Sequence, residues 1–317
     1  MSKYRHRLPQ LDGRLFLTDG GIETSLIFLD GFELPYFAAF DLLKTEKGRK
    51  GLLDYYTRYA TLARDNKLGF VLESPTWRAN RDWAEKLGYD ADALAGANRD
   101  AIRLMTEIRQ KYETRESPMV ISGCIGPRGD GYQPDKLMTV DEAERYHAEQ
   151  IATFADTEAD MVTAITMNYV EEATGLARAA AKAGVPCAIS FTVETDGKLP
   201  TGQTLREAVE SVDAATGNFP AYYMINCAHP THFEDALDAG DPWTKRLRGI
   251  RANASKRSHA ELDAAPDLDA GDPVELGRQY AELTRRLGHL NVLGGCCGTD
   301  HRHVEQICHA VTRRLAA

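Results

Sequence analysis

The sequence predicts an α/β fold, a single-domain (β/α)8 barrel, from two observations. Short, continuously apolar segments rich in Val, Ile and Phe alternate with longer segments of helical periodicity along the whole chain, and such apolar segments are typical of parallel strands buried on both faces. Eight strand–helix units within 317 residues fit a closed barrel better than an open doubly wound sheet. Because no segment resembles a linker, we expect one barrel domain over residues 11–317, preceded by an N-terminal extension of residues 1–10.

The expected strands share this apolar character and recur at intervals that leave room for a helix between them. They are Leu15–Thr18, Phe70–Glu73, Met119–Gly123, Met161–Ile165, Cys187–Thr192, Tyr222–Asn226, Arg248–Ala252 and Asn291–Gly294.

Local capping signals mark the starts of several helices. Segments 139–142 and 204–207 have the Thr-x-x-Glu pattern of a capping box. Asp272-Pro273 places a good N-cap before a proline at the first helical position. Two further segments, Ile27–Gly51 and the acidic, Ala-rich Ser258–Gly271, are expected to be long loops that follow strands.

Composition and charge exclude several classes of protein. The net charge is −9 with both signs interspersed, which argues against general nucleic-acid binding because phosphate-binding surfaces need clustered Lys and Arg. No segment approaches the roughly 18 uncharged apolar residues of a membrane span, and no apolar signal core follows the basic N-terminus. We therefore expect a cytoplasmic protein. Its six cysteines are too few and too scattered for a disulfide framework, and we expect them to be thiols.

Three cysteines are expected at the mouth of the barrel, where active sites of such barrels lie. Cys227 follows the sixth expected strand, and Cys296 and Cys297 follow the eighth, between glycines that allow a tight turn. An all-cysteine set favours zinc, and three protein ligands leave a fourth position open for a substrate. This arrangement suits activation of a substrate thiol better than hydrolysis, because hydrolytic sites usually contribute His or carboxylate ligands.

Other polar residues also stand at expected strand ends, and each has more than one interpretation. Asp19 is as consistent with a turn or cap aspartate as with a substrate contact. Glu73 either contacts a substrate or pairs with an arginine such as Arg78. Asn226 and Asn253 are either donors that orient metal ligands or ordinary turn asparagines.

Five motifs spread over nearly the whole chain point to one family. They are Asp19-Gly20-Gly21, segment 122–127, segment 189–202, Asn226-Cys227 and segment 294–299. Together they resemble the motifs of the homocysteine S-methyltransferase family, a zinc barrel that betaine-dependent, S-methylmethionine-dependent and cobalamin-dependent enzymes share. The motif at 294–299 is highly specific, and its combination with Asn226-Cys227 makes a chance match improbable.

The resemblance implies a zinc-dependent thiol S-methyltransferase with Cys227, Cys296 and Cys297 as the ligands of Zn2+. A bound thiolate, by default that of homocysteine, attacks a methyl group on a small onium donor and gives methionine. The expected donors are S-methylmethionine, S-adenosylmethionine or a betaine, because the sequence has no nucleotide-binding motif and no folate or cobalamin domain. Asp19 and Gly20, in the opening motif, are expected to help hold the substrate. The sequence does not indicate an oligomeric state.

The sequence departs from the family pattern at two strand ends. Ile165 occupies the position after the fourth strand where the family usually carries the glutamate that binds the homocysteine ammonium, and isoleucine cannot pair with a charge. Glu73 stands where the family tends to have small hydroxyl and amide residues. Either Glu23 or Glu73 replaces the missing acid, or the acceptor is a different thiol or a selenol. A non-catalytic barrel that binds zinc or a thiol is a further alternative.

Four aromatic residues lie in expected loops near the barrel mouth: Tyr36, Phe37, Trp77 and Trp83. Their rings could make cation–π contacts to an onium methyl group. Alternatively, these residues cover hydrophobic loop contacts.

Overall fold

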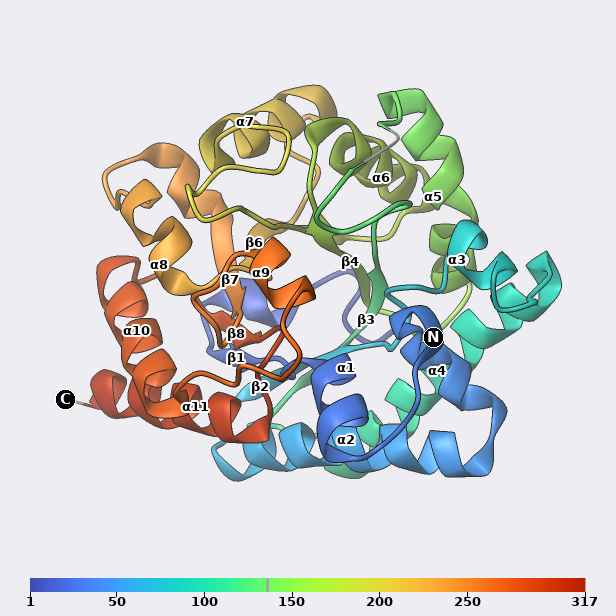
Figure 1. The fold of residues 1–317 in the computed structure, drawn as a ribbon, viewed down its shortest axis with the longest axis horizontal. Helices are drawn as coiled ribbons and strands as arrows, with labels where there is room; N and C mark the ends of the chain where they lie inside the picture. Colours follow the sequence, from blue (N-terminus) through green and yellow to red (C-terminus); the bar gives the residue numbers. More distant parts are fainter. Residues whose placement is uncertain (135–136, 317) are drawn as a thin grey trace.

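The computed structural model describes residues 1–134 and 137–316, which form a closed barrel of parallel strands in the order β1 to β8 (Figure 1). Helices surround the strands, so the predicted single (β/α)8 barrel, a TIM barrel, is confirmed. Every predicted strand overlaps an observed one. The strands are β1 Phe16–Leu17, β2 Gly69–Glu73, β3 Met119–Ile125, β4 Met161–Met167, β5 Cys187–Phe191, β6 Tyr222–Asn226, β7 Leu247–Ala252 and β8 Val292–Gly295.

Several helices begin at the capping signals that the sequence carries. The helices are α1 Ile22–Thr24, α2 Glu46–Asp65, α3 Arg81–Glu85, α4 Ala91–Tyr112, α5 Val140–Ala155, α6 Val170–Ala183, α7 Leu205–Thr216, α8 Pro230–Phe233, α9 His259–Asp263, α10 Pro273–Arg286 and α11 His301–Ala316. Thr139 and Thr204 form the predicted capping boxes, and Asp272 caps α10. Of these described helices, none is long and apolar enough to cross a membrane.

The two predicted long loops contain more regular structure than expected. Residues 46–51 belong to α2, because the Thr45 hydroxyl accepts the Gly48 N–H at 3.0 Å and starts the helix there. Segment 258–271 contains the short helix α9, which Ser258 and Glu261 start with a capping box of their own. Short 3-10 or π turns fill part of the remaining loops: η1 Pro9–Asp12, η2 Ser25–Leu29, η3 Pro35–Phe37, η4 Ala39–Lys44, η5 Glu234–Ala236 and η6 Pro242–Arg246.

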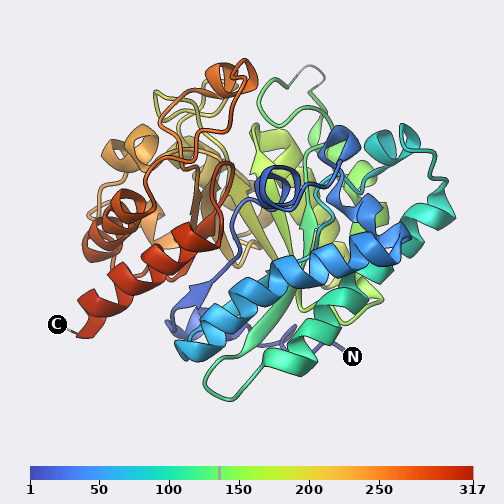
Figure 2. The same cartoon turned by 60° about the horizontal axis from the view of Figure 1, so that its bottom comes forward.

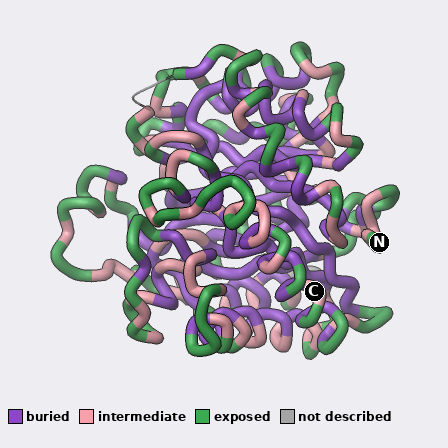
Figure 3. Tube along the Cα trace, turned by 90° about the vertical axis from the view of Figure 1, so that its right-hand side faces the viewer, coloured by how far each residue is buried: buried purple, intermediate pink, exposed green. Residues whose placement is uncertain are grey.

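Buried residues run through the interior of the molecule (Figure 3), and most of the apolar ones fall into two regions. The larger region lies between the strands and the surrounding helices. The smaller closes the bottom of the barrel with residues from the first half of several strands, among them Phe16, Met161, Tyr222 and Val292. Because the bottom is filled with apolar residues, a polar site is left to the opposite end, where the strands lead into their loops (Figure 2).

The N-terminal segment is fastened to this bottom end. The backbone N–H groups of Lys3 and Tyr4 donate to one Asp160 carboxylate oxygen at 2.7 and 2.6 Å. The other oxygen accepts from Arg109 at 2.7 Å and from the Ile121 N–H at 2.9 Å. The separation of residues 1–10 from the barrel domain stays a prediction, and these contacts indicate how to test it.

Candidate metal and substrate site

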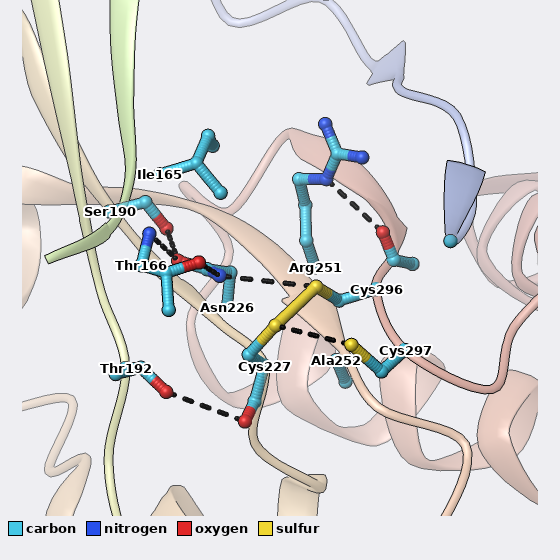
Figure 4. Close-up of a disulfide and its surroundings, with 12 residues drawn as sticks. Ile165, Thr166, Ser190, Thr192, Asn226, Cys227, Arg251, Ala252, Cys296 and Cys297 are labelled. Atoms are coloured by element: carbon cyan, nitrogen blue, oxygen red, sulfur yellow. Dashed lines mark hydrogen bonds between the residues drawn. A yellow bond between two sulfur atoms is a disulfide. The ribbon is translucent and has the colours of Figure 1, made fainter. Parts of the chain in front are cut away.

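Three cysteine sulfurs meet at the C-terminal mouth of the barrel (Figure 4). The sulfurs of Cys227, Cys296 and Cys297 all lie within 4.8 Å of one another. Cys227 and Cys296 are joined in a disulfide with their Cα atoms 5.4 Å apart, and the Cys297 sulfur lies 3.7 Å from that of Cys227. The expectation that all six cysteines are thiols is therefore wrong for this pair, because the fold brings distant cysteines into direct contact. Reduction of the pair yields a cluster of three thiols.

Strand β7 holds both parts of the cluster in place. The Cys227 N–H, just after β6, donates to the Arg251 carbonyl at 3.1 Å, and the Cys296 N–H, just after β8, donates to the next carbonyl, that of Ala252, at 2.9 Å. Cys227 has a positive φ of 52°, a conformation uncommon for a residue other than glycine. The end of β7 therefore fixes the separation of the two cysteine backbones.

Steric and backbone constraints explain why glycine occupies positions 295 and 298. A Cβ on Gly295 would collide with the Thr299 hydroxyl, and that hydroxyl donates to the Cys296 carbonyl at 2.7 Å. Gly298 has φ +79°, and its N–H donates to the Thr24 hydroxyl at 3.0 Å. The Gly21 N–H reaches the Thr299 carbonyl at 3.1 Å. The cysteine loop is thus packed tightly against the loop that follows β1.

Asn226 links the cluster to β4 and β5. Its carbonyl oxygen accepts the Thr166 N–H at 2.9 Å and the Ser190 hydroxyl at 2.6 Å. Its amide nitrogen donates to the Thr166 hydroxyl at 2.8 Å and lies 3.9 Å from the Cys296 sulfur. Thr166 has φ 66°, beside an irregularity in the pairing of β4 with β5. Asn226, which is fully buried, therefore stabilises an unusual backbone next to the thiols.

Tyr132 and His259, which the sequence did not predict, complete the surroundings of the cysteine cluster. The Tyr132 hydroxyl donates to the Cys227 sulfur at 3.3 Å and lies 3.7 Å from the Cys297 sulfur. Its ring packs on His259 of α9 with the ring centroids 4.1 Å apart, and His259 in turn contacts the Cys227 carbonyl at 2.5 Å. Neither residue belongs to a recognisable motif, so only the fold shows that they reach the cluster.

The carboxyl group that acts most strongly on the Cys297 thiol is that of Glu23, on α1. Burial raises its pKa to about 7, and the negative charge of Asp19 adds to the effect. Burial also raises the pKa of the Cys297 thiol to about 11, with Glu23 contributing. Without a cation, the site therefore favours the neutral thiol.

A buried ion pair lies under the mouth. Asp19 is 2% exposed, and its carboxylate lies 2.7 Å from the Arg251 guanidinium and accepts the Tyr55 hydroxyl at 2.8 Å. Glu73 is also buried, which raises its pKa to about 7, although the Arg251 charge acts against this. The side chain of Arg251 also donates to the Gly295 carbonyl at 3.1 Å. The sequence signal for Arg251 was a charged residue within a predicted strand, and Arg248 of the same strand carries the same signal.

The structure thus brings all the sequence-predicted substrate residues to one end of the barrel. Gly20 contributes its carbonyl to Tyr55 at 3.0 Å. Glu73 lies deeper than Ile165, because its neighbours are Ser122 and Thr163, in the lower parts of β3 and β4. Ile165 is 7% exposed, and its carbonyl accepts the Trp77 indole N–H at 3.1 Å.

The aromatic residues at the mouth already have cationic neighbours. The Arg78 guanidinium lies 4.0 Å from the Trp77 ring centroid and 3.9 Å from that of Trp83. The Lys86 ammonium lies 3.7 Å from the Trp83 ring centroid, and Tyr36 packs against the same ring at 6.1 Å. These cations occupy positions over the indoles that an onium donor would need.

Comparison with known proteins places this barrel in a family. The sequence matches the homocysteine S-methyltransferase family over residues 16–311, so the chain belongs to that family. Betaine–homocysteine S-methyltransferase 1 of Rattus norvegicus is 24% identical over 258 residues, which make up 75% of this chain. The match spans 59% of that relative's length.

Solved structures show the same fold. The oxidized form of the homocysteine methyltransferase MmuM from Escherichia coli superposes with a TM-score of 0.76 at 18% identity, over 96% of this chain and 99% of MmuM. The metallated form of MmuM gives a TM-score of 0.72 at 19% identity, over 98% of this chain and all of MmuM.

Proposed function

We propose that this protein is a zinc-dependent S-methyltransferase that moves a methyl group from a small onium donor to a metal-activated thiol. The observation that carries the proposal is the cluster of three cysteines at the C-terminal mouth of a barrel that belongs to the homocysteine S-methyltransferase family.

The reduced cluster fits zinc in both chemistry and spacing. Two sulfurs that are each about 2.3 Å from a tetrahedral zinc lie roughly 3.8 Å apart, and the sulfurs of Cys227 and Cys297 are 3.7 Å apart. Cys227, Cys296 and Cys297 would hold the ion and leave a fourth position for a substrate thiol. When bound, zinc lowers the pKa of a coordinated thiol, so that the sulfur is a nucleophilic thiolate near neutral pH.

The residues of the chain position and shield this site. Asn226 and Tyr132 place hydrogen-bond donors near the Cys296 and Cys227 sulfurs, which orients the ligands. Cys227 is 2% exposed, so little water reaches that side of the cluster.

The substrate sulfur forms a bond to the methyl carbon as the bond from that carbon to sulfonium sulfur or ammonium nitrogen breaks. The donor then leaves as a neutral thioether or amine, and proximity supplies several kcal/mol of the acceleration.

Homocysteine is the acceptor that family membership favours, with methionine as the product and S-methylmethionine, S-adenosylmethionine or a betaine as the donor. A different thiol or a selenol is the second candidate. Two observations favour it: Ile165 cannot pair with an ammonium group, and Arg251 already neutralises Asp19.

A methyl-transfer assay on reduced, zinc-loaded protein tests the proposal. Homocysteine and other small thiols are offered with a panel of onium donors, and mass spectrometry detects the methylated product. Methionine formation supports the homocysteine assignment, whereas methylation of another thiol supports the second candidate. Zinc and thiol binding without turnover on any donor would contradict the enzyme and favour a binding protein.

Replacement of a ligand tests the site itself. We expect Cys297→Ala to lose stoichiometric zinc, measured by a chromogenic chelator, and to lose methyl transfer. Cys308→Ala is the matched control, because Cys308 is buried on α11 away from the cluster. Full activity in the Cys297 variant would disprove the metal site.

A further inference from the structure

A buried arginine without a carboxylate partner lies in the loop after β2. Arg78 is 6% exposed. Its Nη1 donates to the Gly129 carbonyl at 3.1 Å, whereas its Nε is buried without any hydrogen-bond partner. Within residues 1–134 and 137–316, no carboxylate lies within 4.0 Å of this guanidinium. The Nε edge of the fork is therefore left for a group that the protein does not supply.

The surroundings fix the orientation of this guanidinium. The guanidinium carbon of Arg78 lies 4.0 Å from the ring centroid of Trp77 and 3.9 Å from that of Trp83, which is van der Waals contact. The Trp77 indole is itself held by the Ile165 carbonyl. Such packing limits the rotation of Arg78, so its free edge is pre-organised for a planar ligand.

The segment after β3 connects the surroundings of Arg78 to the thiol cluster. A Cβ on Gly131 would lie 3.4 Å from the Trp77 ring and 3.2 Å from the Thr166 methyl group. The next residue, Tyr132, touches the cysteine sulfurs. The negative charge of Glu23 raises the pKa of both Arg78 and Cys297. A substrate with its sulfur or methyl group at the cluster would extend along this segment to place its other end at Arg78.

The energetics favour an anionic partner over a cationic one. Burial of a cation is costly, and burial lowers the pKa of Arg78 to about 10, although the negative charges of Asp130 and Glu23 act against this. Lys86, whose ammonium lies over the Trp83 ring, adds a second positive charge. A planar carboxylate matches a guanidinium edge with two parallel hydrogen bonds, whereas an onium group would be repelled.

We infer that Arg78 receives the carboxylate of a substrate, so that the recognised end of that substrate is its acid group and not its ammonium group. The inference rests on the proposed function and deepens it. It also accounts for Ile165, since a substrate held by its carboxylate does not require an acid at that position. The carboxylate comes from either the thiol acceptor or the methyl donor.

Calorimetric binding to reduced, zinc-loaded protein tests the inference with two ligand pairs. One pair is homocysteine and its decarboxylated analogue, an aminopropanethiol. The other is S-methylmethionine and its decarboxylated sulfonium analogue. We expect the wild-type protein to prefer the acid of one pair by about 10- to 100-fold, and that pair identifies the source of the carboxylate.

Three variants give the readout. Arg78→Gln is expected to abolish the preference, and Arg78→Lys to keep part of it, because a lysine retains the charge without the fork. Arg81→Gln is the control, since Arg81 is 57% exposed and pairs with Glu149 on the surface. Arg78→Lys also keeps the test valid if the glutamine variant fails to fold.

The failures of the two proposals are distinguishable. A folded, zinc-loaded Arg78→Gln protein with an unchanged preference overturns the inference alone. So does a wild-type protein that methylates thiols but binds acids and decarboxylated analogues equally. A wild-type protein that neither binds nor methylates any thiol overturns the proposed function, and the inference with it.

Discussion

Asn226 shows how a single side chain supports both the backbone and the thiol cluster. Its amide makes three hydrogen bonds to Thr166 and Ser190 and lies near the Cys296 sulfur. We expect Asn226→Ala to leave the buried Thr166 N–H unpaired, which lowers the free energy of unfolding by about 1–3 kcal/mol. We also expect zinc affinity to fall roughly 10- to 100-fold, as for other residues that orient metal ligands.

Chelator competition and urea denaturation measure these two effects separately. Asn66→Ala is the matched control, because Asn66 caps the end of α2, far from the mouth. Wild-type zinc affinity in the Asn226 variant would mean that Asn226 does not orient the ligands.

Glu73 gives the protein a pH-dependent stability. Burial raises its pKa from 4.5 to about 7, so the folded state binds a proton more tightly than the unfolded state. The stability cost of ionising Glu73 is absent below pH 4.5, grows as the pH rises and is complete above about pH 7. Across this interval the wild-type protein should lose about 3 kcal/mol of unfolding free energy through the ionisation of Glu73. We expect the Glu73→Gln variant to keep it. Urea denaturation at pH 5 and pH 7.5 measures it, and equal losses in both proteins would contradict the assignment.

At the scale of elements, the strand ends and helix caps could be predicted because they depend on neighbouring residues. β6 was predicted with its observed bounds, and the capping boxes before α5 and α7 were found. The cysteine cluster was foreseen because its motif is local to β6 and β8. The start of α2 and the whole of α9 were missed, although Thr45 and Ser258 carry cap signals of their own.

The rest of the site could not be predicted because it depends on contacts between distant segments. Tyr132 reaches Cys227 across 95 positions of the sequence. Arg251 meets Asp19 only when the barrel closes. The position of Arg78 between two indoles depends on how the loops after β2 fold over the mouth. No periodicity or spacing in the sequence encodes such contacts.

The buried contact between α4 and the loop before β4 is an element-level test. Arg109 and Asp160 are 8% and 0% exposed and pair at 2.7 Å. We expect Arg109→Met to lower the free energy of unfolding by about 3 kcal/mol, because a buried charge loses its partner. Zinc stoichiometry should not change, since the pair lies at the opposite end of the barrel. Urea denaturation and chelator titration check both.

Two controls sharpen this test. Lys50→Met removes an exposed pair with Asp54 and is expected to cost less than about 1 kcal/mol. Deletion of residues 1–10 removes the Lys3 and Tyr4 contacts to Asp160. A deletion without effect on stability would support the predicted separation of this segment from the barrel domain.

For the whole molecule, oxidation and zinc binding should exclude each other. The Cys227–Cys296 disulfide removes two of the three thiols, so we expect oxidised protein to bind no zinc and reduced protein to bind one ion. Zinc at about 100 times its Kd should stabilise the reduced protein by about 2.7 kcal/mol. Thermal denaturation with and without reductant measures the shift. A zinc-dependent increase in Tm of the oxidised protein would contradict the assigned ligands.

The order of the cluster residues along the chain has a consequence for synthesis. One proposed ligand, Cys227, directly follows the sixth strand, whereas the other two follow the eighth, which must pair with the first strand to close the barrel. A nascent chain on the ribosome therefore carries a single candidate ligand until the residues after β8 have been translated. Tight metal retention would then mark only polypeptides in which β8 has been made and the barrel has closed, whereas products of translation that stops before β8 would remain metal-free.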